Sequence, residues 1–346
     1  MTRATLFTLT SFFWASNIYA QEENIDISAS LKTEVSMNIN NGKTNWVNLL
    51  EAGSDIPLWN SMTATISILA NQNTRIGNNK SWSIADDMQS FSNIQTDKQI
   101  PIAPAIIGIA DEISTLKMFL GVRNMNSDYF ASPLTGLFTN SSHGIYPTIA
   151  DNFNVGNYPV TSLCFHAEWN ITKEITLKNS LYNGEASYKW DEAFRFRPSR
   201  DGIINITEIA YSSTDSSSYF GEYHLGGVYG NKNSNYSIFA LVEQPIIIGV
   251  KPISLLFQGG FAPKKKNDTY YYMGTGIVMR NILKRDDAIG ISANRSLYTE
   301  GKNENCMELT YSIPINNHIE IQPSAHFIHS NGDNYTVALL RATFSL

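Results

Sequence analysis

Residues 307–346 read MELTYSIPINNHIEIQPSAHFIHSNGDNYTVALLRATFSL, and a period of two in this stretch decides the fold. Apolar residues alternate with polar residues over positions 307–313, 319–327 and 338–346. Such alternation is typical of β-strands with one apolar face, because successive side chains point to opposite sides. The polar positions include Glu, His and Arg. They suit a water-filled lumen, although alternation alone does not distinguish a lumen from bulk solvent.

The same alternation recurs at positions 116–122 and 162–169. The sequence contains about sixteen candidate strands, and bacterial outer-membrane barrels have an even number. We therefore predict an all-β fold, a transmembrane antiparallel up-and-down β-barrel of about 16 strands. The candidate strands begin near Leu31, Met62, Trp82, Ile100, Thr115, Thr161, Glu174, Ile203, Glu222, Asn235, Pro252, Tyr270, Asp286, Asn305, His318 and Asn334.

The composition agrees with a membrane barrel. Charged residues make up 16% of the chain, whereas a soluble domain has about 25%. Beyond residue 20 no apolar stretch reaches the ~18 residues that a membrane helix requires. Only helices and closed barrels satisfy their own backbone hydrogen bonds in lipid. The net charge of −6 disfavours a nucleic-acid partner, and two cysteines, Cys164 and Cys306, are too few for a disulfide scaffold.

Residues 1–20 have the pattern of an export signal. Arg3 gives a positive start, residues 4–15 are mostly apolar, and Ala20 precedes the expected cleavage point. The apolar run is too short to span a bilayer as a helix. We therefore expect a signal peptide at residues 1–20 and one outer-membrane β-barrel domain at residues 21–346.

The spacing of the candidate strands predicts long connections on the outside and short turns in the periplasm. Long connections are expected at residues 40–61, 124–160, 183–202 and 294–304. Short turns are expected at residues 111–114, 171–173 and 316–317. The stretch SSTDSSSYFGE after Tyr211 is an exception, because it is long for a periplasmic turn.

The connection at residues 124–160 far exceeds the usual length of about 4–6 residues, which favours a functional role. We predict that this loop folds into the lumen and forms a narrow waist. The alternative is that it merely packs against the barrel wall.

Several spaced stretches give the chain a resemblance to the carbohydrate-selective porin family of outer-membrane barrels. They occur in the same order as in that family and cover most of the mature chain. Two features depart from the family. The chain looks shorter than typical members, and it ends in Leu346 instead of an aromatic residue, with Phe344 on the same face. The stretches are SFSNIQTD at 90–97, KMFLGVRNMNSDYFA at 117–131, FTNSSHGIYPTI at 138–149, LYNGEA at 181–186, RDDAIGIS at 285–292 and ELTYSIPINNHIEIQPSAHFIHSNG at 308–332.

The resemblance implies a sixteen-stranded barrel with a charged, constricted waist, through which small sugars diffuse passively across the outer membrane of a Gram-negative cell. The expected solutes are mono- or small oligosaccharides. Such a pore needs charged and polar groups that replace the water lost by sugar hydroxyls, and aromatic faces for the C–H side of the ring. No cofactor is expected.

Candidate pore-lining residues follow from these requirements. Lys117 and Arg123 share the polar face of one strand, and the strand parity of four further charged residues turns them towards the lumen. The alternative for each charged residue is that it only hydrates the lumen wall. The loop contributes Phe138, Asn140, Ser141, His143 and Tyr146, and the wall contributes Glu168, Glu308, Glu320 and Arg341.

Further partners and other functions stay open at this point. Lys264, Lys265 and Lys266 lie in an outer loop, where they either bind lipopolysaccharide phosphate or form a solvated tip. Contact with outer-membrane lipid is expected, and a homo-oligomer is left open because no interface strand stands out. The alternatives are a porin without sugar preference, a plugged barrel with an adhesive or structural role, and a barrel enzyme.

An enzyme or a metal site has little support. Catalysis would need a His beside a nucleophile or an acid, and no nucleophile motif accompanies His143, His166 or His224. His326 and His329 are three residues apart, which places them on opposite faces of a strand. We therefore predict no catalytic residues and no metal ligands.

Overall fold

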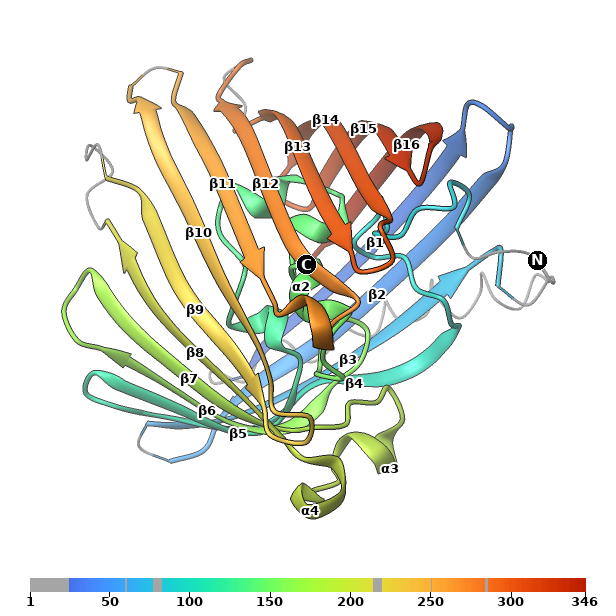
Figure 1. Cartoon of the computed structure of the whole chain (residues 1–346). Coiled ribbons are helices and arrows are strands. Elements are labelled where there is room, and N and C mark those ends of the chain that lie inside the picture. Colours follow the sequence, from blue (N-terminus) through green and yellow to red (C-terminus); the bar gives the residue numbers. More distant parts are fainter. Residues whose placement is uncertain (1–24, 60, 77–82, 214–219, 250, 284–285) are drawn as a thin grey trace.

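The computed structural model describes residues 25–59, 61–76, 83–213, 220–249, 251–283 and 286–346. Sixteen strands form one closed barrel in which each strand pairs with its neighbours in sequence and β1 pairs with β16 (Figure 1). The predicted fold class is confirmed. The predicted signal peptide lies outside the described residues. The strands are β1 (Asp26–Asn38), β2 (Thr44–Pro57), β3 (Met62–Asn73), β4 (Ile100–Ile113), β5 (Leu116–Arg123), β6 (Ser162–Asn170), β7 (Ile175–Asn183), β8 (Ile203–Ser212), β9 (Glu222–Gly230), β10 (Asn235–Ile247), β11 (Ile253–Phe261), β12 (Thr269–Arg280), β13 (Ala288–Tyr298), β14 (Asn303–Asn316), β15 (Ile319–Ser330) and β16 (Asp333–Ser345).

The two faces of the barrel differ as the alternation predicts. On β14, Met307 is 54% exposed while its neighbour Glu308 is 1% exposed, and on β15 Phe327 is exposed while His326 is buried. A continuous belt of exposed Leu, Ile and Phe around a closed sheet is unfavourable in water and favourable in lipid. The polar face therefore lines the interior.

The three longest connections all follow odd-numbered strands. Residues 74–99, 124–161 and 184–202 lie on the odd side, whereas the longest even-side connection spans residues 213–221. Figure 1 shows the segment 124–161 in green inside the ring of strands, with α3 and α4 beyond the strand ends. This asymmetry assigns the odd side to the exterior.

Short helical turns occur in these outer connections. None of the helices in the described part of the chain is long and apolar enough to cross a membrane. The turns are η1 (Met125–Ser127), η2 (Thr135–Leu137), η3 (Ser141–His143), α2 (Pro147–Ala150), α3 (Trp190–Ala193), α4 (Pro198–Asp201) and η4 (Lys264–Lys266).

Two strand predictions are wrong, and their errors cancel in the count. Residues 44–57 form β2, although we expected an outer connection over residues 40–61. Val47 and Leu49 turn towards the lumen, where residues of the in-folded segments bury them, so apolar residues occupy both faces and the alternation is lost. Trp82 lies outside the described residues, and residues 83–99 contain no strand.

The apolar residues that follow Trp82 in the sequence do not form a lipid-facing strand. Ile84, Phe91 and Ile94 are buried inside the barrel instead of facing lipid. Two connections are also shorter than predicted. The region 294–304 reduces to residues 299–302, because β13 and β14 extend into it, and the turn expected at residues 111–114 reduces to residues 114–115.

The outward face predicts a depth-dependent cost for a buried charge. Leu120 in the middle of β5 and Ile113 at the periplasmic end of β4 are 61% and 56% exposed. We expect Leu120→Arg to lower the free energy of unfolding in lipid vesicles by ~2–4 kcal/mol and Ile113→Arg by ~0–1 kcal/mol. Urea titration of tryptophan fluorescence measures both, and equal costs would contradict the proposed membrane placement.

Candidate functional site

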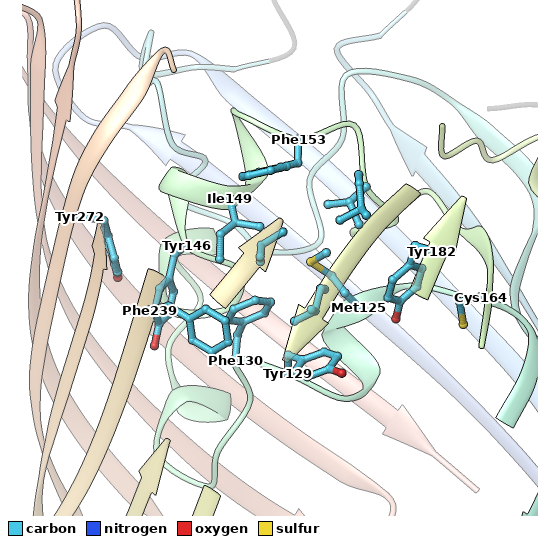
Figure 2. Close-up of a cluster of buried hydrophobic side chains, with 14 of the residues drawn as sticks. Met125, Tyr129, Phe130, Tyr146, Ile149, Phe153, Cys164, Tyr182, Phe239 and Tyr272 are labelled. Atoms are coloured by element: carbon cyan, nitrogen blue, oxygen red, sulfur yellow. The ribbon is translucent and has the colours of Figure 1, made fainter. Parts of the chain in front are cut away.

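The long connection 124–161 is held inside the barrel by an aromatic cluster. Phe130 contacts Phe239 of β10 with ring centroids 4.7 Å apart, and Tyr146 contacts Tyr272 of β12 at 5.2 Å. Figure 2 shows these rings together, with loop and wall residues alternating across the contact. Apolar burial thus fixes this part of the loop against one side of the wall.

Wall glycines let the loop approach closely. Phe138 is fully buried over β12 and β13. A Cβ atom at Gly290 would lie 2.8 Å from the Phe138 ring, and one at Gly276 would lie 3.0 Å from it. Because any larger residue would push the ring towards the pore axis, these glycines keep the loop flat against the wall.

His143 is a polar anchor of the same loop. Its Nδ1 lies 2.8 Å from Oε1 of Gln258 on β11, and its Nε2 lies 2.8 Å from Oγ of Ser292 on β13. Gln258 also donates to the His143 carbonyl at 2.9 Å. Burial lowers the pKa of His143 to about 4, so the ring is neutral near pH 7.

A wall carboxylate holds the loop at its next polar point. Glu308 of β14 accepts hydrogen bonds from the backbone N–H of Thr139 at 2.7 Å and of Asn140 at 3.0 Å. The hydroxyl of Thr139 lies 2.9 Å from the same carboxylate and 3.0 Å from Nε2 of His326 on β15. Glu308 and Asn140 are both buried, so this contact excludes bulk water.

A second segment, residues 83–99, also lies inside the barrel. Arg341 of β16 donates from Nε to Glu34 of β1 at 2.6 Å and from Nη2 to the side chain of Asn93 at 2.6 Å. Ser92 donates to the other oxygen of Glu34 at 2.5 Å. Arg341 therefore binds the second segment at the seam between the first and last strands.

Charges of opposite sign face one another along one lumen row. In the strand register Lys117 lies opposite Glu168, Glu168 opposite Lys178, and Lys178 opposite Glu208. Lys178 and Glu208 form an ion pair at 3.5 Å. Directly opposed unlike charges stabilise neighbouring strands, and here they also provide alternating donors and acceptors along the wall.

Arg123 connects this row to the loop. Its Nη2 lies 2.6 Å from Oδ1 of Asp128, and its guanidinium lies 4.6 Å from the Phe119 ring centroid. Lys178 donates to the Asp128 carbonyl at 2.8 Å. The start of the loop is therefore tied to the charged row of the wall.

The structure brings five of the sequence-predicted residues together between loop and wall and three, Lys117, Arg123 and Glu168, on β5 and β6, while Ser141, Glu320 and Arg341 lie apart from both sets. Phe138, Asn140, His143 and Tyr146 are buried between loop and wall together with Glu308. Arg123, Ser141, Glu168 and Glu320 are partly exposed, Lys117 is exposed, and Arg341 on β16 is 6% exposed. Whether any of these side chains touches a solute stays a prediction.

Sequence reasoning missed Glu34, Asn93, Asp128, Lys178 and Glu208. Strand parity would have found Lys178 and Glu208, since both lie on the lumen face of strands that the alternation marks. Asn93 lies within SFSNIQTD, so the family resemblance includes this stretch but does not show where it lies in the barrel. Among the described residues, no group of three or more His, Cys, Asp or Glu side chains is placed to hold a metal ion.

Comparisons with known proteins agree on one family. The model described as carbohydrate-selective porin, OprB family, matches residues 112–235 and 228–346. No curated protein matches the chain in sequence.

Solved structures share the fold at low sequence identity. The high-pH structure of OprB from Pseudomonas putida has a TM-score of 0.83 at 16% identity and covers 96% of this chain and 97% of that one. The low-pH structure of the same protein has a TM-score of 0.66 at 16% identity, with 97% of both chains covered. An anion-selective porin from Comamonas acidovorans has a TM-score of 0.61 at 10% identity, with 94% of this chain and 100% of that one covered.

The depressed pKa of His143 predicts how acid affects loop docking. The docked ring binds a proton only near pH 4, whereas a released His does so near pH ~6.5. Docking should therefore be strongest above pH ~6.5 and weaken as the pH falls towards 4. The NMR titration midpoint of the His143 ring in detergent measures this, with His143→Gln to assign the signal, and a midpoint near that of free His would contradict burial of the ring.

Proposed function

The chain belongs to the carbohydrate-selective porin OprB family, and on that premise we propose that its two in-folded segments form a charged waist through which mono- or small oligosaccharides diffuse passively. The protein is an outer-membrane porin with an all-β barrel and is not an enzyme. The observation that carries the proposal is the row of alternating charges on the lumen wall, next to the in-folded loop.

Alternating charges suit neutral, polyhydroxylated solutes. A sugar hydroxyl both donates and accepts hydrogen bonds. Glu168 offers an acceptor directly opposite Lys117, which offers donors. A sugar moving along such a row exchanges one partner for the next and keeps little net binding energy, which conduction requires. A row of one sign would instead favour ions of the other sign.

Arg123 is the residue most suited to contact the solute near the loop. The Asp128 carboxylate holds its guanidinium in place, and 14% of its side chain is exposed. The Phe119 ring packs against the guanidinium, with its centroid 4.6 Å from the guanidinium carbon. The fixed fork leaves some of its five N–H donors for hydroxyl oxygens.

We extend the proposal to targeting and to the membrane. Residues 1–20 would act as the export signal, and the basic turn η4 would face lipopolysaccharide phosphate. Lys264 lies 4.7 Å from the Tyr270 ring centroid and Lys266 donates to the Ser234 carbonyl at 2.9 Å, so the turn is held in place by its own contacts. Association of barrels into a homo-oligomer stays a prediction.

Recordings from single channels in planar bilayers test the proposal. Concentration-dependent block by glucose or maltose is expected for a sugar-preferring pore. Conductance without block would instead indicate a porin without sugar preference, and absence of conductance would indicate a plugged barrel.

Arg123→Ala tests the site assignment. The variant removes a charge-assisted donor, and such hydrogen bonds contribute about 1.5–3 kcal/mol. We expect the half-blocking sugar concentration to rise about tenfold, which corresponds to ~1.4 kcal/mol. Lys43→Ala, which removes one positive charge from the exposed turn between β1 and β2, is the matched control. Unchanged block in Arg123→Ala would remove Arg123 from the site.

A further inference from the structure

Two glutamates on one face of β14 bind the two in-folded segments in the same way. Glu308 accepts the consecutive N–H groups of Thr139 and Asn140, one on each carboxylate oxygen. Glu304 likewise accepts the consecutive N–H groups of residues 88 and 89, with Met88 N–H on Oε2 at 2.6 Å and Gln89 N–H on Oε1 at 2.9 Å. Each carboxylate thus closes on a backbone turn with both oxygens occupied.

Neither glutamate has a basic partner within 4 Å among the residues that the structure describes. Both are 1% exposed. Burying a carboxylate without a cation is costly unless hydrogen bonds satisfy it. The paired amides supply those hydrogen bonds, so the buried carboxylate of each glutamate is stabilised only while its loop segment is docked.

The two segments also bind each other where the glutamates hold them. Ser141 N–H donates to the Ser90 carbonyl at 2.9 Å, and Asn93 N–H donates to the Thr139 carbonyl at 2.7 Å. Residues 88–93 and 139–141 therefore form one unit, which we call the waist pair. Two stretches that carry the family resemblance, SFSNIQTD and FTNSSHGIYPTI, supply residues 90–93 and 139–141 of the waist pair, and Met88 and Gln89 directly precede the first stretch.

The waist pair is also anchored to strands close to β14, where Asn93 accepts from Arg341 of β16, Ser92 donates to Glu34 of β1 and Phe91 packs against His326 of β15. The aromatic cluster of the long loop packs on β5 to β10 and β12, on another part of the wall. At β14 the contacts of the waist pair are mainly polar and come from Glu304 and Glu308. Loss of the glutamates would release the amides of residues 88, 89, 139 and 140 from β14, while the other anchors and the aromatic cluster keep both segments inside the lumen.

We propose that Glu304 and Glu308 are positioning residues that set the aperture of the pore by holding the waist pair flat against β14. This inference rests on the proposed function as a diffusion pore. It assigns the limit on solute size to two wall carboxylates that need not touch the solute.

Conservative substitutions separate this role from a simple effect of charge. In Glu→Gln one carboxylate oxygen becomes an NH₂ donor, which opposes the second backbone N–H. In Glu→Asp the charge stays but the shorter side chain withdraws from the amides. Both changes should release the waist pair from β14. If only the negative charge mattered, Glu→Gln would alter the pore and Glu→Asp would not.

The experiment compares Glu304→Gln, Glu308→Gln, Glu308→Asp and the double Gln variant in the full-length barrel. Conductance and liposome swelling with sugars of increasing size report the aperture. Hydrogen exchange at residues 88 and 89 reports docking at Glu304, and exchange at residues 139 and 140 reports docking at Glu308. A difference in gel migration between unheated and heated protein verifies a folded barrel. Glu51→Gln is the control, because Glu51 is a lumen-side acid that pairs with Lys32 at 3.3 Å.

We expect the Gln and Asp variants to conduct more and to admit larger sugars than the parent. Amide protection should fall about tenfold or more at residues 88 and 89 in the Glu304 variant and at residues 139 and 140 in the Glu308 variants, as expected for losing a hydrogen bond to a charged group. Glu51→Gln should leave the size limit unchanged. If the double variant does not fold, the single variants carry the test.

Two results would overturn the inference. One is an unchanged size limit and unchanged protection in folded Gln variants, and the other is parent-like behaviour of Glu308→Asp. Failure of the proposed function looks different, because the parent barrel would then conduct without sugar block while the variants still altered its aperture.

Discussion

Closure of the backbone hydrogen bonds between β1 and β16 is the constraint on which the rest of the structure depends. Lipid offers no partner for an unpaired N–H or C=O group, so a spanning sheet must have no free edge. Residues 30–38 pair with residues 337–345 across this seam. Once the ring is closed, the outer face of the strands can be apolar, and their polar side chains must be accommodated on the inner face.

The arrangement of the lumen depends on the chain segments that fill it. A ring of sixteen strands encloses more space than wall side chains fill, and two outer connections enter to occupy it. Apolar contacts such as Phe130 on Phe239 fix one side of the long loop, and buried carboxylates such as Glu308 fix the other. The charged row through Glu168 and Lys178 remains beside this filling, and we propose that the solute passes along it.

The sequence predicts the barrel well because alternation is a local property. Where apolar residues occupy both faces, as at Val47 and Leu49, the signal disappears and β2 is missed. The local nature of the alternation also limits how much of the functional site can be predicted. Parity assigns Glu308 and Arg341 to the lumen, but their partners, Thr139 and Asn93, lie on irregular segments. Their path depends on tertiary packing that no local period encodes, so the contacts within the waist could not be predicted.

The inward course of residues 83–99 and 124–161 has a consequence for recognition from outside the cell. With both segments inside, the third long connection, residues 184–202, is the largest feature described at the outer rim (Figure 1). Trp190, Phe194 and Phe196 are exposed there. Antibodies or phage tail proteins that approach this barrel would find their main epitope on that one segment, and immune or phage pressure could change it without disturbing solute passage.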